Sequence, residues 1–220
     1  MVTNMDLQKT LAEALPEMQN GDLLLVRQQG LIARAGRGKY SHAAMFAWWN
    51  DEPFCLEVLQ GKGGRAVHLA QMVNQYPGQY EVFQANADAR WGDFQRDATV
   101  RFMCQLTGCK YGYHSVMMTA LLHLPLVRFF TQADTDDASG NSDPQSLDEI
   151  LCRPFCSQAV SMAYRIGGGV NPVPQLADRY TEPNDLARSP FFRRFAALVP
   201  DTPPKSQTEM ILYEAAKEKF

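Results

Sequence analysis

Residues 153–167, RPFCSQAVSMAYRIG, are the stretch on which the interpretation of this sequence depends. Pro154 suits the first turn of a helix, and Gly167 suits the position just past a helix end. Between them, apolar residues recur at helical spacing, which indicates one face packed on a core. The stretch therefore predicts a buried helix that carries Cys156 in its first turn.

A thiol at the start of a helix lies beside unpaired backbone N–H groups and the positive end of the helix dipole. Its pKa is therefore expected to fall toward that of a thiolate, and the same N–H groups can receive an oxyanion. The alternative is a cysteine packed as a small hydrophobic residue, which is usual for free thiols. We interpret the other four cysteines in this second way: Cys55, Cys104, Cys109 and Cys152.

The rest of the chain predicts one α+β domain in which sheet precedes helix. Residues 1–20 are expected to form a helix and residues 21–90 mainly sheet, because short apolar runs alternate there with turn signals. Residues 91–199 are expected to be mainly helical, and residues 200–220 form a tail. The expected strands are 23–27, 41–49, 54–59, 67–72 and 80–84, and the expected later helices are 94–107, 153–167 and 191–199.

Composition excludes several classes of protein. The chain has 220 residues and a net charge of −3, so it has no basic field to hold a nucleic acid. Five cysteines without close paired spacing predict neither a disulfide framework nor a zinc site, and we expect no metal or cofactor. The N-terminus does not have the pattern of a secretory signal, and the most apolar stretch, 116–130, is too short for a membrane span. The acidic segment 131–148 is expected to be a loop, either a solvated linker or a cover over a site.

His42 and Glu57 are the candidates for the base and its orienting group. Small neighbours surround His42 at the start of a strand, and Glu57 lies fifteen residues later on the next strand of an expected hairpin. This odd separation allows both side chains to project from one face. A turn centred on residues 51–52 would nevertheless place Glu57 opposite Phe46, so that only an earlier turn or a bulge brings it beside His42. The alternatives are an ordinary histidine and an exposed charge on the sheet.

The order of these motifs resembles the permuted (YiiX-like) branch of the NlpC/p60 papain-like cysteine amidases. The matching features are Gly21-Asp22 before a strand, Ser41-His42 opening the next strand, Glu57 on the one after, and Cys156 starting a late helix. The sequence Asn184-Asp185-Leu186 is also similar to the C-terminal region of that group. The resemblance implies a circularly permuted papain-like fold, with an antiparallel sheet or small barrel packed against helices.

The resemblance further implies that Cys156 is the nucleophile, His42 the general base and Glu57 the third catalytic residue. It implies cleavage of amide bonds in bacterial cell-wall peptides, with a peptidoglycan stem peptide as substrate. Without a signal sequence, such an enzyme could act on cytoplasmic wall fragments, be released by a phage, or be exported as an antibacterial toxin by a type VI or other specialised secretion machine. The last role implies a carrier and an immunity protein as partners.

Two other functions remain open from the sequence. The same cysteine and histidine could form a thioester for acyl transfer, as in related enzymes of permuted papain-like fold. The chain could also be a non-catalytic binding module in which Cys156 is only packed. Tyr111 and Tyr113 could line a cleft, but aromatic residues before a helix are more often part of a core.

Overall fold

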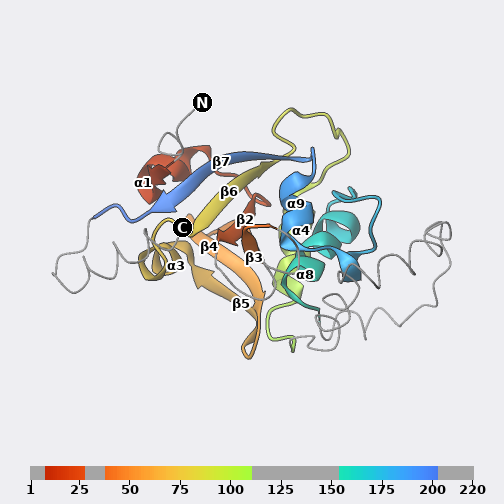
Figure 1. Cartoon of the computed structure of the whole chain (residues 1–220), viewed down its shortest axis with the longest axis horizontal. Coiled ribbons are helices and arrows are strands. Elements are labelled where there is room, and N and C mark those ends of the chain that lie inside the picture. Colours follow the sequence, from red (N-terminus) through yellow and green to blue (C-terminus); the bar gives the residue numbers. More distant parts are fainter. Residues whose placement is uncertain (1–7, 28–37, 111–153, 203–220) are drawn as a thin grey trace.

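The computed structural model describes residues 8–27, 38–110 and 154–202, and its centre is a seven-stranded sheet (Figure 1). The strand order is β1-β7-β6-β2-β3-β4-β5, and every neighbouring pair is antiparallel except β1 and β7. The sheet is open, with β1 and β5 at its edges, so the small-barrel alternative is wrong and the α+β class is confirmed. The strands are β1 (Gln8–Thr10), β2 (Leu23–Arg27), β3 (Tyr40–Trp49), β4 (Glu52–Leu59), β5 (Gly63–His68), β6 (Tyr80–Ala85) and β7 (Phe192–Val199).

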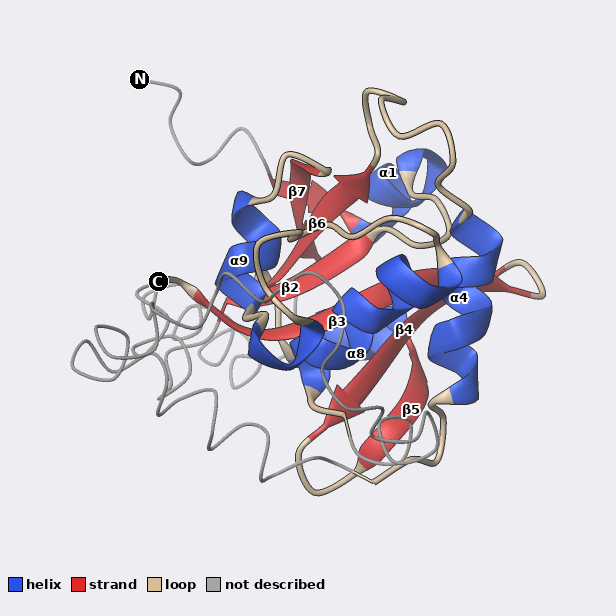
Figure 2. Cartoon of the chain, turned by 90° about the vertical axis from the view of Figure 1, so that its right-hand side faces the viewer, coloured by secondary structure: helices blue, strands red, loops and turns tan. Residues whose placement is uncertain are grey.

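Helices cover both faces of this sheet (Figures 1 and 2). On one side lie α1 (Leu11–Ala14), the 3₁₀ turn η2 (Leu15–Glu17) and α3 (Leu69–Gln75). On the other lie α4 (Arg96–Gln105), α8 (Cys156–Met162), its π-helical continuation η4 (Ala163–Gly167), η5 (Asp178–Tyr180) and α9 (Pro183–Arg188). Each side encloses its own apolar core. Within the described ranges, no helix has the length and apolar character needed to cross a membrane.

The β3–β4 hairpin has a two-residue turn that is one residue earlier than the centre considered from the sequence. Trp49 pairs with Glu52, so Asn50 and Asp51 form the turn, with φ angles of 49° and 62°. A two-residue hairpin turn of this kind requires positive φ at both positions, which Asn and Asp tolerate better than most residues. The earlier turn places Glu57 opposite Ala44 instead of Phe46.

Three expectations about the elements were wrong. Residues 192–199 form strand β7 between β1 and β6, where a helix was expected, because both flanking strands pair with it. The strand expected at 67–72 begins earlier, as β5, and continues into helix α3 from Leu69. The N-terminal helix is confined to residues 11–17 among those described, and strand β1 precedes it.

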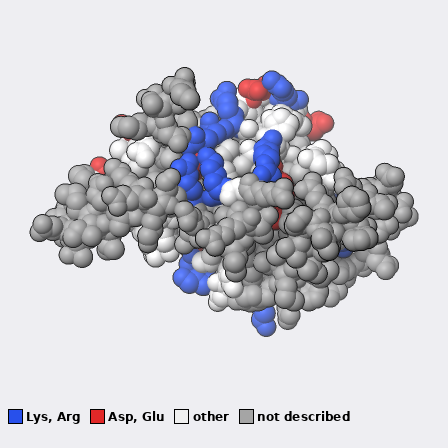
Figure 3. All heavy atoms as spheres, in the orientation of Figure 1, with Lys and Arg blue, Asp and Glu red and all other residues white. Residues whose placement is uncertain are grey.

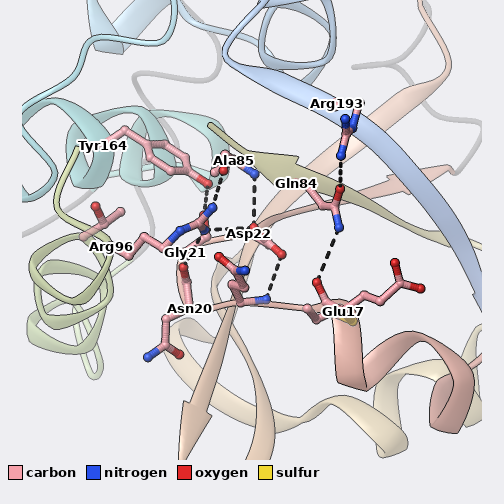
Figure 4. Close-up of polar contacts among 12 residues, drawn as sticks. Glu17, Asn20, Gly21, Asp22, Gln84, Ala85, Arg96, Tyr164 and Arg193 are labelled. Carbon is pink, nitrogen blue, oxygen red and sulfur yellow. Dashed lines mark hydrogen bonds and ion pairs between the residues drawn. The ribbon is translucent and has the colours of Figure 1, made fainter. Parts of the chain in front are cut away.

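A buried ion pair explains why Gly21-Asp22 precedes β2 (Figure 4). The Asp22 carboxylate is 1% exposed and accepts from the Arg96 guanidinium at 3.0 Å and from the backbone N–H groups of Gln19 and Ala85 at 2.9 and 3.1 Å. Arg96 also donates to the carbonyl of Ala85, and Tyr164 donates to the carbonyl of Gly21 at 2.7 Å. These contacts join β2, β6, α4 and η4 at one point.

Replacing Arg96 by Met should therefore destabilise the fold. The Asp22 carboxylate would lose its cation while remaining buried, and this should lower the free energy of unfolding by about 2–4 kcal/mol. Arg101→Met is the matched control, because Arg101 lies exposed on the same helix. Urea denaturation of the three proteins measures the difference. An equal loss in both variants would mean that the Asp22 pair has no special role.

Candidate functional site

Cys156 is the first residue of α8, and the surrounding structure fixes this helix firmly. Every residue of α8 is buried. The hydroxyl of Ser157 donates to the carbonyl of Thr181 at 2.8 Å, and that of Ser161 donates to the Asp178 carboxylate at 2.7 Å. Arg165, one turn further on, binds the second oxygen of Asp178 at 2.7 Å. The position of the Cys156 thiol is therefore set by hydrogen bonds along the helix that carries it.

The thiol reaches the sheet where β3 and β4 separate. The pairing of these strands stops at Ala44 and Glu57, and the remaining residues of β4 pair only with β5. The next residue toward the start of β3, Ala43, donates its backbone N–H to the Cys156 sulfur, as does Ser157. The end of the strand pairing thus leaves a backbone donor for the thiol.

His42 joins the thiol to a buried carboxylate. Its Nε2 lies 2.6 Å from Oε2 of Glu57, and its ring is also hydrogen-bonded to Cys156. The second oxygen of Glu57 accepts from the guanidinium of Arg65, including Nε at 2.8 Å. Arg65 is the direct cross-strand partner of Glu57 on β5, and the Glu57 side chain is 1% exposed. Cys156, His42, Glu57 and Arg65 therefore form one continuous chain of polar contacts.

The chain of contacts fixes the tautomer of His42. Burial raises the pKa of Glu57, but His42 and Arg65 together hold it below its usual range, so Glu57 is an ionised acceptor. A carboxylate has no proton to donate, so Nε2 of His42 must be the donor. This leaves Nδ1 as the ring nitrogen that interacts with the thiol.

The electrostatics favour a thiolate–imidazolium pair. Burial alone would lower the pKa of His42, but the bond and charge of Cys156, followed by those of Glu57, raise it to about 10. Burial would raise the pKa of Cys156, yet His42 and the N–H groups of Ala43 and Ser157 lower it. His42 contributes more to this lowering than the helix N–H of Ser157 does. Among the contacts of the thiol, the bond and charge of His42 are thus the main cause of the lowered pKa of Cys156.

The structure brings together all three residues singled out from the sequence: Cys156, His42 and Glu57. Sequence reasoning missed Arg65, because the strand expected there was placed at 67–72, whereas β5 already begins at Gly63. It also gave no role to Asn184. The side-chain amide of Asn184 accepts from the backbone N–H of Tyr40 at 3.1 Å and donates to the Tyr40 carbonyl at 3.0 Å, which fixes the start of β3. Four features considered earlier lie outside the described residues: Tyr111, Tyr113, Cys152 and the segment 131–148.

Comparison with known proteins identifies a shared fold. No family model and no curated protein matches the sequence. The structure is similar to the crystal structure of the metalloprotein YiiX from Escherichia coli O157:H7, with a TM-score of 0.53 and 16% identity. The alignment covers 83% of this chain and 98% of that one. The chain is therefore an α+β protein with the fold of YiiX, and at this identity the similarity extends to the fold alone.

The described residues do not form a metal site, although the similar YiiX structure is that of a metalloprotein. Among them, no three His, Cys, Asp or Glu side chains come together to hold an ion. The candidate site has a thiol, an imidazole and a carboxylate, but both oxygens of Glu57 are already bound by His42 and Arg65. A second cation beside the Arg65 guanidinium would also be repelled.

The Cys156 thiol should be unusually reactive at low pH. Because its pKa is lowered, Cys156 should react with iodoacetamide at about pH 6, where an ordinary thiol is almost entirely protonated. Its reaction should remain fast as the pH rises further, because deprotonation of His42, whose pKa is raised to about 10, leaves the sulfur as a thiolate. In His42→Ala the pH at which the alkylation rate of Cys156 rises should increase to that of an ordinary or buried thiol. Peptide mass spectrometry across the pH range measures the labelling of each cysteine.

Cys104 serves as the internal control in the same experiment. It is partly exposed, and burial raises the pKa of its thiol. Equal labelling of Cys104 and Cys156 at pH 6 would contradict an ion pair at the site.

Arg65 should act on the thiol as a positioning residue, through Glu57 and His42. In Arg65→Met the pKa of Glu57 should rise, so Glu57 stabilises the His42 imidazolium less. The alkylation rate of Cys156 should then begin to rise only at a higher pH than in the wild type. The alkylation rate at pH 6 should fall by about tenfold, which is the effect of one charged hydrogen bond. Arg65→Lys keeps the charge and should recover part of the rate. If both variants keep the wild-type pH profile, Arg65 has no influence on the site.

Proposed function

We propose that this protein is a cysteine hydrolase that cleaves amide bonds, with Cys156 as nucleophile, His42 as acid and base, and Glu57 as orienting group. The observation that carries the proposal is the bonded series Cys156–His42–Glu57, in which the thiol pKa is lowered and the imidazole pKa is raised. A nucleophile, a base within hydrogen-bonding reach and a third group that fixes the base are the parts that acyl transfer requires.

In the first step, the thiolate of Cys156 attacks the carbonyl carbon of the amide, and the electron pair of the double bond moves to the oxygen. The backbone N–H of Cys156 is the proposed donor to this oxyanion. As the tetrahedral centre collapses, the carbon–nitrogen bond breaks, and the His42 imidazolium gives its proton to the leaving amine. A thioester to Cys156 and a neutral His42 remain.

In the second step, neutral His42 takes a proton from water, and the resulting hydroxide attacks the thioester carbon. The carbon–sulfur bond breaks and releases the acid, and the starting thiolate–imidazolium pair is restored. Throughout the cycle, Glu57 accepts from Nε2 and keeps the reactive nitrogen directed at the sulfur. Arg65 keeps Glu57 ionised, so that this acceptor is present in both steps.

We further propose that the fold is a circularly permuted papain-like fold and that the substrate is a bacterial cell-wall peptide. The chain order supports the first statement, because the strand with His42 precedes the helix with Cys156. The resemblance of the sequence motifs to permuted NlpC/p60 amidases supports the second. The fold shared with YiiX is compatible with both proposals.

Mass spectrometry of peptidoglycan peptides incubated with the protein tests this function. The wild-type chain should release a defined fragment whose mass identifies the bond cleaved. Cys156→Ala should release none, and His42→Ala should be slower by at least about a thousandfold, as expected for loss of a catalytic base. Cys104→Ala is the matched control, because it removes a thiol that has no contact with His42, and it should keep the wild-type rate.

The other outcomes separate the competing functions. If no fragment forms but Cys156 still reacts as a low-pKa thiol and transfers an acyl group to an added amine, the protein is an acyltransferase. Fragment release that persists in Cys156→Ala would exclude Cys156 as the nucleophile.

A further inference from the structure

A second buried carboxylate, Glu81 on β6, lies at the centre of a cluster of positive charge. Its side chain is fully buried, and the Tyr40 hydroxyl donates to it at 2.6 Å. Three cations surround it: Arg194 with Nε at 2.5 Å, Arg27 in direct contact with the other carboxylate oxygen, and Lys39 with Nζ at 3.9 Å. The cluster, defined as Arg27, Lys39, Glu81 and Arg194, therefore has three positive charges and one negative charge.

The positive excess of this cluster has no counter-charge among the described residues. One cation is enough to neutralise Glu81, and no other acidic side chain there forms an ion pair with Arg27, Lys39 or Arg194. In addition, Nε of Arg27 is buried and has no hydrogen-bond partner within the part of the chain that the structure describes. Holding two surplus charges at a partly buried position costs free energy, and a bound anion would offset that cost.

The pKa values agree with this account. Burial lowers the pKa of Lys39, and the neighbouring charges of Arg27 and Arg194 lower it further, against the opposing effect of Glu81. The pKa of Glu81 is itself held below its usual range by Tyr40 and the cations, although burial would raise it. The carboxylate therefore stays ionised, and the cations repel one another.

The cluster can be reached from solvent and has a rigid support. The side chains of Arg27, Lys39 and Arg194 are 20%, 51% and 25% exposed. Figure 3 shows Lys and Arg side chains gathered over the region of β6 and β7. The residues come from β2, β6 and β7 and from the position before β3, which are neighbouring elements of one sheet. A ligand would thus meet donors that are already in place.

We propose that this cluster binds the phosphate group of a ligand through Arg27, Lys39 and Arg194. A phosphate monoester carries about −1.5 to −2 charges near pH 7, which matches the excess of two positive charges. Guanidinium groups donate to phosphate oxygens through paired N–H groups, and both arginines retain N–H groups that Glu81 does not occupy. The ion pairs of the buried Glu81 carboxylate then keep the three cationic side chains in position around the ligand.

This site is separate from the proposed catalytic centre. A β-bulge between Val26 and Arg27 changes the pairing, so that Val26 faces His42 while Arg27 faces Tyr40. Because neighbouring strand residues point to opposite faces, the bulge directs Tyr40 and His42 to opposite sides of β3. The cluster shares no residue with the proposed catalytic centre, so phosphate binding can be tested whether or not the protein is a hydrolase.

Isothermal titration of inorganic phosphate into the full chain, in a chloride-poor buffer without phosphate, tests the proposal. Binding to the wild-type chain should be saturable, with one site, and should weaken as salt is added. Arg194→Gln and Lys39→Gln should each weaken binding by about tenfold or more, the usual effect of one charged contact. The matched control is Arg193→Gln: Arg193 is adjacent on β7 but is 62% exposed and pairs with Asp88 and Gln84.

Two further measurements make the outcome decisive. Circular dichroism establishes that each variant is folded, and Lys39→Gln provides a test even if loss of Arg194 unfolds the chain, because Lys39 is half-exposed. Titration with phenyl phosphate distinguishes the source: binding as tight as that of phosphate identifies an esterified group, whereas exclusion identifies free phosphate. The proposal is overturned if phosphate does not bind saturably, if succinate binds equally well, or if Arg193→Gln weakens binding as much as Arg194→Gln does.

Discussion

The sharing of one buried carboxylate, Glu57, between an imidazole and a guanidinium is the interaction on which the candidate site depends. A lone ionised carboxylate in this position would be costly, and it would become protonated instead. Arg65 prevents this on one oxygen, so that the other remains a charged acceptor for His42. From sulfur to guanidinium the charges alternate in sign, and each group stabilises the ionised form of the next. The reactive state of Cys156 is thus supported from a residue three contacts away.

The framework around the site holds these groups by hydrogen bonds made at strand and helix ends. The side-chain amide of Asn184 in α9 is hydrogen-bonded to the backbone N–H and carbonyl of Tyr40, just before His42. The hydroxyl of Ser157, just after Cys156, fixes α8 by its bond to the carbonyl of Thr181. The early end of the β3–β4 pairing provides the N–H of Ala43 for the sulfur. At the other end of α8, Tyr164 joins the helix to the loop of Gly21, whose carboxylate neighbour Asp22 is held by Arg96. Hydrogen bonds from α9 and from the loop of Gly21 therefore hold the elements that carry His42 and Cys156.

The sequence predicted local features well and long-range pairing poorly. Strand β2 and the helix with Cys156 were found because turn signals and apolar spacing within a few residues define them. Strand β7 was mistaken for a helix, because its apolar residues also fit helical spacing and its partner β6 lies more than a hundred residues earlier in the chain. Arg65 was missed for a related reason: its role follows from pairing with Glu57, which requires β5 and its register to be known. The Glu57 register itself depended on the Asn50-Asp51 turn. The tolerance of Asn and Asp for positive φ favours that turn over one at Asp51 and Glu52, and this local signal was not applied.

That short turn also limits how this chain can vary during evolution. Insertions in surface loops are usually tolerated, and a hairpin tip far from a site is a typical place for them. Here, a single residue added to the tip and taken up by the pairing would move Glu57 to the other face of β4 and exchange it with an apolar neighbour, Leu56 or Val58. An addition of two residues would restore the face but shift the carboxylate along the strand, away from His42. Lineages that retain the site should therefore conserve the length of this tip more strictly than its composition, although no residue of the tip touches the site.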